Sequence, residues 1–324
     1  MISVVIPTYG RPASVIECVE SVLNNNYSSE YEILIIDQAP DSTLGNEVHR
    51  RYGNTATIRY FFHDVAGASR ARNLGVRCAH GEIVAFIDDD VIADPGWLKS
   101  IARTFCDVHP RPGLMAGRIL PIWLCSRPRW LPREREFLLG LYDIGDQAKL
   151  LPDADLPLSA NMAALRQLVI DIGGFDERLG FDYSRKEPMI AGEDSMLGQQ
   201  LKDAGHLIYY QPAAIGRHKI SKLKLSPRYF LRRHFWEGVT VVTCMKLMGT
   251  IKRDASASII SYHIRAMTRS AGRLIFAVTR AQCNRPRSSA AMLELSHICY
   301  SLGAIYAAAR LSRDAQEKST KCTG

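Results

Sequence analysis

Short apolar runs alternate with amphipathic stretches through the first hundred residues. Four runs are rich in β-branched or aromatic residues and end at a polar residue or proline, which predicts four β-strands. They span residues 2–6, 32–36, 57–62 and 82–87. Between them, apolar side chains recur at helical spacing from Val15 to Leu23, and residues 68–79 and 95–106 are long enough for further helices. This alternation predicts an α/β fold with an open, mostly parallel sheet flanked by helices.

Polar residues that follow these strands are the first candidates for chemistry, because open parallel sheets bind ligands beyond the carboxyl ends of their strands. These residues are Pro7, Thr8 and Tyr9 after the first run, Asp37 and Gln38 after the second, and Asp88, Asp89 and Asp90 after the fourth. Asp94 and Pro95 then offer an N-cap and a proline suited to the first helical position. We therefore expect the acidic segment to lie on a short loop that leads directly into a helix.

Residues 121–157 interrupt the alternation. Their five prolines and the charged run 133–136 predict a long irregular insertion, either a lid or binding surface or a purely structural excursion. The α/β pattern then resumes with an apolar segment at 158–165, a Gly-Gly turn at 173–174, a helix at 195–203 and a strand at 207–210.

Beyond residue 220 the pattern is helical, over about 226–249, 255–282 and 288–313. Charged residues interrupt every apolar stretch, so no membrane-spanning helix is predicted. Residues 259–280 pair apolar side chains with four arginines. This mixture suits an amphipathic helix on an anionic membrane surface, or equally a helical appendage packed on the body with a solvated basic face.

Composition and charge divide the chain in two. With 324 residues, 47% hydrophobic and 23% charged, it is globular rather than disordered. The net charge of +8 combines 20 Lys and Arg against 5 Asp and Glu in residues 217–324 with 21 against 28 in residues 1–216. A basic section of this kind favours polyanions or is simply a solvated face. We expect a catalytic α/β domain over 1–218 and a basic helical region over 219–324.

The cysteines and the N-terminal residues indicate the cellular compartment in which the protein is expected. Eight cysteines without a C-x-x-C pair argue against a zinc site and favour a reduced compartment. No basic segment followed by a long apolar run opens the sequence, so no signal peptide is expected. The chain is predicted to be cytoplasmic and, from its basic helices, peripheral on the inner face of the cell membrane. No nucleic-acid-binding module is recognisable, so nucleic acid is not an expected partner.

Three consecutive aspartates after a buried strand need a neutralising cation, because neighbouring carboxylates raise one another's pKa. Alternation along an extended segment places Asp88 and Asp90 on one side and Asp89 on the other. Oxygen ligands of this kind suit Mg²⁺ or Mn²⁺, which bind through one or two carboxylates and substrate phosphates. An ordinary solvated turn would also accommodate such a triplet.

Six segments resemble glycosyltransferase family 2 in order and spacing, over about residues 1–218. They read VVIPTYGRP, IIDQAPDST, GASRARNLG, GEIVAFIDDD, LSANMAALRQLVIDIGGFDERLG and AGEDSMLGQQLKDAGHLIYYQP. The resemblance implies a GT-A fold, a nucleotide-diphosphate sugar donor, a divalent metal (Mn²⁺ or Mg²⁺) and transfer with inversion at the anomeric carbon.

The resemblance also implies roles for the residues on the donor side. Asp88 and Asp90 match the DxD element that anchors metal and diphosphate, with Asp89 beside them as a further donor contact. His218 matches a region where some relatives place an additional metal or diphosphate contact, although a structural histidine is equally compatible with the sequence.

The nucleotide pocket in this resemblance is lined by four residues, Pro7, Thr8, Tyr9 and Asp37. Gln38 stands where the family commonly has a second acidic residue, which leaves the base of the donor open. Arg72 falls at a position that is often a donor-side cation, and a salt bridge that caps the core is the alternative.

On the acceptor side, Glu193 and Asp194 resemble the family's ED element. Asp194 is the expected general base, because inversion needs a carboxylate on the face of the sugar opposite the leaving group. Without the resemblance, the pair would be read as acidic residues favoured at a helix N-terminus. Asn161 and Trp130 are acceptor-binding candidates, by hydrogen bonding and ring stacking, or serve local structure.

These observations predict a metal-dependent inverting glycosyltransferase that acts on a lipid-linked or cell-surface polysaccharide precursor. Two alternatives stay open. A sugar-phosphate nucleotidyltransferase shares an α/β nucleotide fold and acidic metal ligands, but the first loop here lacks the expected Gly-rich, basic character. A non-catalytic protein that binds membrane or another polyanion would explain the basic helices alone.

Overall fold

The computed structural model describes residues 1–41, 43–53, 55–152, 157–182, 189–251, 255–279 and 287–321. Two compact units divide the chain. The α/β unit comprises residues 1–122, 140–188 and 193–219, and the helical unit comprises residues 123–139, 189–192 and 220–324. The segment predicted as one insertion is therefore divided between the units. Arg280, the last arginine of the predicted interfacial stretch, lies outside the described residues.

The four predicted N-terminal strands are present. They are β1 (Ile2–Thr8), β2 (Tyr31–Asp37), β3 (Ile58–Phe62) and β4 (Ile83–Ile87). They pair in parallel in the order β3-β2-β1-β4. The burial of β1 and β4 on both faces explains their nearly continuous apolar sequences.

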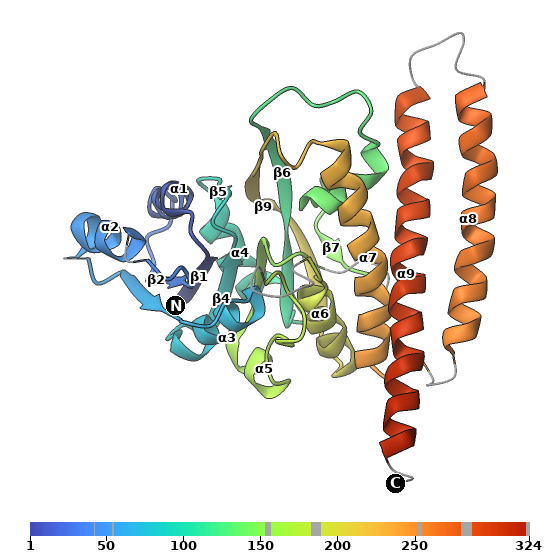
Figure 1. The fold of residues 1–324 in the computed structure, drawn as a ribbon. Helices are drawn as coiled ribbons and strands as arrows, with labels where there is room; N and C mark the ends of the chain where they lie inside the picture. The colour runs from blue at the N-terminus through green and yellow to red at the C-terminus, as the bar shows by residue number, and fades with distance from the viewer. Residues whose placement is uncertain are drawn as a thin grey trace. The chain divides into compact units, whose positions relative to one another are not determined.

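Helices connect these strands as right-handed crossovers require. They are α1 (Pro12–Leu23), α2 (Thr43–Tyr52) and α3 (Ala68–Cys78). The chain moves outward from β1 to β3 and then returns to β4 on the other side of β1. Accordingly, α1 and α2 lie on one face of the parallel strands and α3 lies on the opposite face (Figure 1). The strand order reverses between β1 and β4, where an open α/β sheet binds its ligand.

Antiparallel strands complete the same sheet in the order β4-β8-β6-β9-β5, with β7 paired to β9. They are β5 (Val91–Ala93), β6 (Leu114–Trp123), β7 (Lys149–Leu150), β8 (Asn161–Leu165) and β9 (Ile208–Ile220). The predicted α/β class is thus confirmed, and the parallel pairing is confined to β3-β2-β1-β4 among the pairs described.

The expected passage from the acidic segment directly into a helix is wrong. Strand β5 intervenes, and α4 (Trp97–Asp107) begins three residues after Asp94, with Gly96 at its N-cap. The Asp94 carboxylate instead accepts hydrogen bonds from Arg217 of β9, at 2.6 and 2.9 Å. The ion pair between Asp94 and Arg217 takes the place of the helix N-cap that the local sequence predicts for Asp94. The spacing of residues in the sequence does not reveal this pair.

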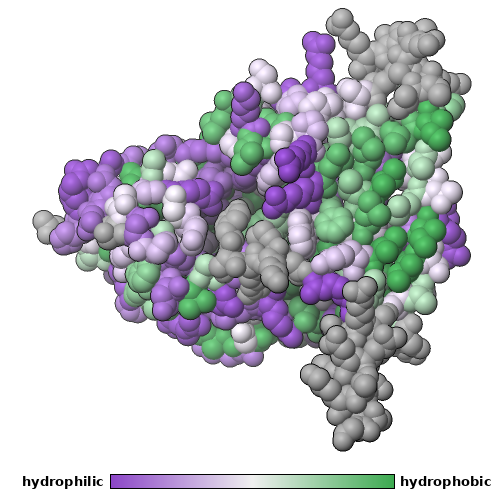
Figure 2. Space-filling view, viewed as in Figure 1, coloured by the Kyte–Doolittle hydropathy of each residue, from purple (hydrophilic) through white to green (hydrophobic). Residues whose placement is uncertain are grey.

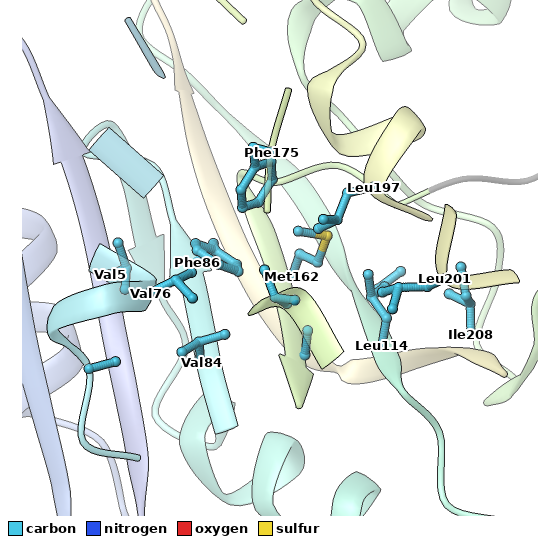
Figure 3. Close-up of a cluster of buried hydrophobic side chains, with 14 of the residues drawn as sticks. Val5, Val76, Val84, Phe86, Leu114, Met162, Phe175, Leu197, Leu201 and Ile208 are labelled. Atoms are coloured by element: carbon cyan, nitrogen blue, oxygen red, sulfur yellow. The ribbon is translucent and has the colours of Figure 1, made fainter. Parts of the chain in front are cut away.

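Apolar side chains from the sheet and two further helices, α5 (Arg166–Asp171) and α6 (Glu193–Asp203), form the core of the α/β unit. Figure 3 shows Phe86 of β4 facing Phe175, and their rings meet edge to face with centroids 5.1 Å apart. Leu197 and Leu201 of α6 extend this cluster toward Ile208 of β9. The core therefore fixes the start of α6 relative to the end of β4.

The helical unit contains η1 (Arg133–Leu139), α7 (Pro227–Leu247), α8 (Ser256–Thr279) and α9 (Arg287–Lys321). Helices α7 and α9 approach closely at two glycines: a Cβ on Gly238 would lie 2.0 Å from the carbonyl oxygen of Tyr300, and one on Gly303 would lie 1.8 Å from that of Phe235. In the part of the chain that the structure describes, no helix is both long and apolar enough to cross a bilayer.

Candidate active site

The acidic segment lies at the point where the strand order reverses. Thr8, the last residue of β1, donates a hydrogen bond from Oγ1 to Oδ2 of Asp89, just beyond β4, over 2.6 Å. Because the carboxyl ends of β1 and β4 meet here, the two predicted motifs that follow these strands form one site.

The three aspartates alternate as an extended segment requires. The side chains of Asp88 and Asp90 are 32% and 13% exposed, whereas that of Asp89 is fully buried. Burial raises the pKa of Asp89 to about 7 against the opposing effect of Arg11. Asp88 and Asp90 are consequently the carboxylates available to a ligand.

Asp90 is paired with His218. Its Oδ1 lies 3.2 Å from Nε2 of His218, a residue of β9 opposite Val91. The other ring nitrogen, Nδ1, lies 3.2 Å from the carbonyl oxygen of Gly140. Since a carbonyl only accepts, Nδ1 donates to Gly140, and Nε2 is the ring nitrogen that faces Asp90. A backbone carbonyl orients metal-binding histidines in the same way.

This pair fits a divalent cation. Two donors bound to one Mg²⁺-sized ion at about 2.1 Å and at right angles lie about 3 Å apart, close to the observed 3.2 Å. Among the residues described, no group of three or more His, Cys, Asp or Glu side chains is arranged around a common metal position. The predicted ligand set of Asp88, Asp90 and His218 is therefore not gathered at one position, since Asp88 pairs with Arg72. Asp90 and His218 would be the protein's ligands, with phosphate and water oxygens completing the shell.

Arg72 joins the acidic segment to the start of α6. Its guanidinium donates to Oδ1 of Asp88 and to Oε1 of Glu193, each over 2.9 Å, and its side chain is only 4% exposed. Burial and the neighbouring Asp194 raise the pKa of Glu193, which Arg72 opposes. The buried position of Glu193 suits it to hold Arg72 in place.

Asp194 is fixed by three hydrogen bonds. Its Oδ2 accepts from the backbone nitrogen and the hydroxyl of Ser159, at 3.0 and 3.2 Å, and its Oδ1 accepts from the backbone nitrogen of Ser195 at 2.8 Å. The side chain is partly exposed, and it also interacts electrostatically with Arg72. Asp194 is thus an oriented carboxylate that shares a network with Asp88.

Asp37 and Gln38 are engaged inside the protein. Asp37 is fully buried, and its carboxylate accepts from the backbone nitrogen of Ala39 and from the Tyr60 hydroxyl. Burial raises its pKa. Gln38 donates to the carbonyl oxygens of Val65 and Gly67. Both side chains are buried and hold the segments that follow β2 and β3 in place.

The remaining predicted contacts differ in position. Pro7 and Thr8 are buried within β1, and Tyr9 is 42% exposed. Asn161 is buried, accepts from Nε1 of Trp97, and donates to one carbonyl oxygen on β6 and one on β9. These bonds use both of its amide protons. Trp130 belongs to the helical unit, where its ring packs edge to face on Phe230 at 5.5 Å.

Comparisons with known proteins identify the domain. Residues 3–150 match the family model of Glycosyl transferase family 2. The chain carries a glycosyltransferase family 2 domain. It is 26% identical over 245 residues to a glucosyl-dolichyl phosphate glucuronosyltransferase of Haloferax volcanii, covering 73% of this chain and 75% of that protein. It is 33% identical over 155 residues to a pre-mycofactocin glycosyltransferase of Mycobacterium tuberculosis, covering 47% of this chain and only 30% of that protein.

Solved structures extend the likeness in fold beyond the glycosyltransferase family 2 match. A mannosyltransferase of Pyrobaculum calidifontis, in complex with GDP-Man and Mn²⁺, aligns over 94% of this chain and 87% of its own with a TM-score of 0.62 at 15% identity. S. aureus TarS 1-349, in complex with UDP-GlcNAc, aligns over 98% and 92% with a TM-score of 0.52 at 15% identity. The α/β unit has the GT-A fold.

One contact of this glycosyltransferase domain escapes the sequence patterns. Arg11, which follows β1, lies 2.8 Å from Asp89 and 3.0 Å from Asp90. Only its place in the Pro7 to Pro12 segment hints at this contact.

A cavity of about 250 Å³ between α2 and β3 is lined by residues such as Val48 and Tyr52, and none of the acidic-segment residues lines it.

Proposed function

We propose that this chain transfers a sugar, with inversion, from a nucleotide-diphosphate sugar to a hydroxyl of a lipid-linked acceptor. The family 2 domain and the GT-A fold support a glycosyltransferase with this class of donor. The activity for which the Haloferax relative is named supports a lipid-phosphate-linked acceptor. The observation that carries the mechanism is the Asp88–Arg72–Glu193 bridge, which couples the donor-side carboxylates to the start of α6.

In this mechanism Asp194 takes the proton from the acceptor hydroxyl while the hydroxyl oxygen attacks the anomeric carbon. The bond from that carbon to the diphosphate oxygen breaks, and the nucleoside diphosphate leaves with both electrons. Ser159 and Ser195 orient the Asp194 carboxylate. A divalent ion held by Asp90 and His218 would stabilise the negative charge that develops on the leaving group.

A donor screen tests this proposal. The chain is incubated with Mn²⁺ and a panel of UDP-, GDP- and dTDP-sugars, and its thermal unfolding is followed. A true donor at about 100 times its Kd adds about 2.7 kcal/mol to the free energy of unfolding. Transfer or slow hydrolysis of that donor should release nucleoside diphosphate. Release of pyrophosphate would favour a nucleotidyltransferase, and the absence of any stabilising donor would contradict the proposal.

We also propose that α8 attaches the protein to an anionic membrane surface. Tyr262, Arg265, Arg269 and Phe276 recur at helical spacing along one exposed face of α8, and the two aromatic side chains are 62% and 56% exposed. Figure 2 shows apolar side chains gathered over the region of α8 and α9. Apolar and basic side chains on one face suit an interfacial helix.

Vesicle flotation of the full chain tests this attachment. Vesicles that contain phosphatidylglycerol should carry the protein upward, whereas vesicles of phosphatidylcholine alone should leave it in solution. The double variant Arg265→Glu, Arg269→Glu should remain in solution with both. Equal partitioning of the variant and the wild type would contradict the role of α8.

A further inference from the structure

Arg11 bridges two of the three aspartates in the acidic segment. Its Nη2 lies 2.8 Å from Oδ1 of Asp89, and its Nη1 lies 3.0 Å from Oδ2 of Asp90. Since Oδ1 of Asp90 faces His218, both oxygens of Asp90 are engaged. A cation bound by Asp90 therefore comes close to the guanidinium of Arg11 or to the ring of His218.

The two arginines that contact the segment differ in their freedom to move. The Arg72 side chain is 4% exposed, and its guanidinium also stacks near the Phe175 ring, 5.7 Å from the centroid. Moving it would leave the buried Glu193 carboxylate without its cation, which is costly. The Arg11 side chain is 49% exposed, so its contact with the partly exposed Asp90 can be exchanged at little cost while its contact with the buried Asp89 is kept. Arg11 is the arginine able to exchange partners.

We propose that Arg11 is the counter-ion of Asp89 and Asp90 before the donor binds, and that it then releases Asp90 and binds the donor's diphosphate. This inference rests on the proposed function, because it requires a nucleotide-diphosphate donor and a divalent cation at Asp90. A divalent cation at Asp90 repels the guanidinium, and the diphosphate offers it new oxygen acceptors in the same site. The planar fork of arginine matches phosphate oxygens in a bidentate manner.

The exchange predicts effects of opposite sign on two ligands. In Arg11→Ala, Mn²⁺ alone should bind about three- to tenfold more tightly, because a competing positive charge has been removed. The same variant should bind a nucleoside diphosphate in the presence of Mn²⁺ at least tenfold more weakly, because a charge-assisted contact has been lost. Arg11→Lys keeps the charge and loses the fork, so its Mn²⁺ affinity should resemble that of the wild type while its nucleotide affinity falls between the two.

Binding measurements test the exchange without any need for turnover. Free Mn²⁺ is measured by electron paramagnetic resonance in titrations without nucleotide. UDP and GDP are then titrated calorimetrically in saturating Mn²⁺. Arg111→Ala is the matched control, since Arg111 forms an exposed ion pair with Glu82, which precedes β4, whereas the acidic segment follows the other end of that strand. Circular dichroism confirms that each variant is folded.

The inference is supported if Mn²⁺ affinity rises and nucleotide affinity falls in Arg11→Ala while Arg111→Ala matches the wild type. It is overturned if Arg11→Ala binds Mn²⁺ no more tightly than the wild type, or if its nucleotide affinity stays within twofold of the wild-type value. A wild-type protein that binds neither UDP nor GDP overturns this inference for those nucleotides. The separate donor screen decides the proposed function.

Discussion

Substitution of Gly140 by alanine should displace the ring of His218. Gly140 has a φ of +79°, and a Cβ at this position would lie 2.7 Å from Cε1 and 2.8 Å from Nδ1 of His218. Ordinary contacts begin at about 3.4 Å, so the ring must move by more than half an ångström. It would then lose the orientation that the Gly140 carbonyl imposes.

Two contributions to the cost can be separated. A non-glycine residue in left-handed backbone costs about 1–2 kcal/mol. Overpacking against the imidazole adds about 1–3 kcal/mol. Gly173 supplies the matched control, because its φ is +86° and a Cβ added there would meet nothing within 4 Å. Gly173→Ala should therefore show the backbone cost alone.

The assay compares both variants by urea unfolding and by Mn²⁺-dependent nucleotide binding. Gly140→Ala should unfold about 1–3 kcal/mol more easily than Gly173→Ala, and its Mn²⁺ requirement should rise about 10- to 100-fold, as for the loss of a partner that orients a metal ligand. Gly173→Ala should keep the wild-type Mn²⁺ requirement. Indistinguishable variants in both measurements would refute the orientation of His218 by Gly140.

Two further substitutions test buried ionisable side chains, Arg72 in the α/β unit and His234 in the helical unit. Arg72→Met should lower the free energy of unfolding by about 3–5 kcal/mol at pH 7.5, because Glu193 loses its buried partner. The loss should be smaller at pH 5, because a protonated Glu193 needs no cationic partner. Urea unfolding at both pH values checks this, and a loss that does not depend on pH would contradict it. In the helical unit, burial lowers the pKa of His234 to about 4 from 6.5. The unfolded state binds the extra proton, so stability should fall by up to about 3 kcal/mol as the pH drops from 6.5 through 4. His234→Gln should flatten that part of the pH profile, and an unchanged profile would exclude His234 as its origin.

Local patterns predicted the parallel part of the fold well. The runs that form β1, β2 and β4 are short, buried and bounded by polar residues, and the run that forms β3 is short and partly buried. Strand β5 was missed because three residues are too few for a pattern and its pairing with β9 joins residues 91–93 to 216–218. The helix α2 carries few apolar residues and buries only Leu44 and Val48, so few apolar positions mark it in the sequence.

The candidate site was predictable to the extent that it depends on strand ends. Asp88 and Asp90 were identified from their place after a buried run, and alternation separated them from Asp89. The partners of Arg72 were not predictable, since Glu193 lies 121 residues away. Arg11 was overlooked for the same reason, because it follows β1 whereas its partners Asp89 and Asp90 follow β4. Such pairings require the fold, whereas the residue types that supply the chemistry are visible in the chain.

Replacing Asp194 tests most directly the proposal that this residue acts as the general base opposite the leaving diphosphate. Asp194→Asn keeps the size of the side chain, and Asp203→Asn, at the other end of α6, is the control. Both variants are compared with the wild type in donor binding by calorimetry and in single-turnover transfer with the donor found by the screen. We expect Asp194→Asn to bind donor within about threefold of the wild type and to transfer at least 10²-fold more slowly, while Asp203→Asn transfers normally. Transfer by Asp194→Asn at the wild-type rate would contradict the account.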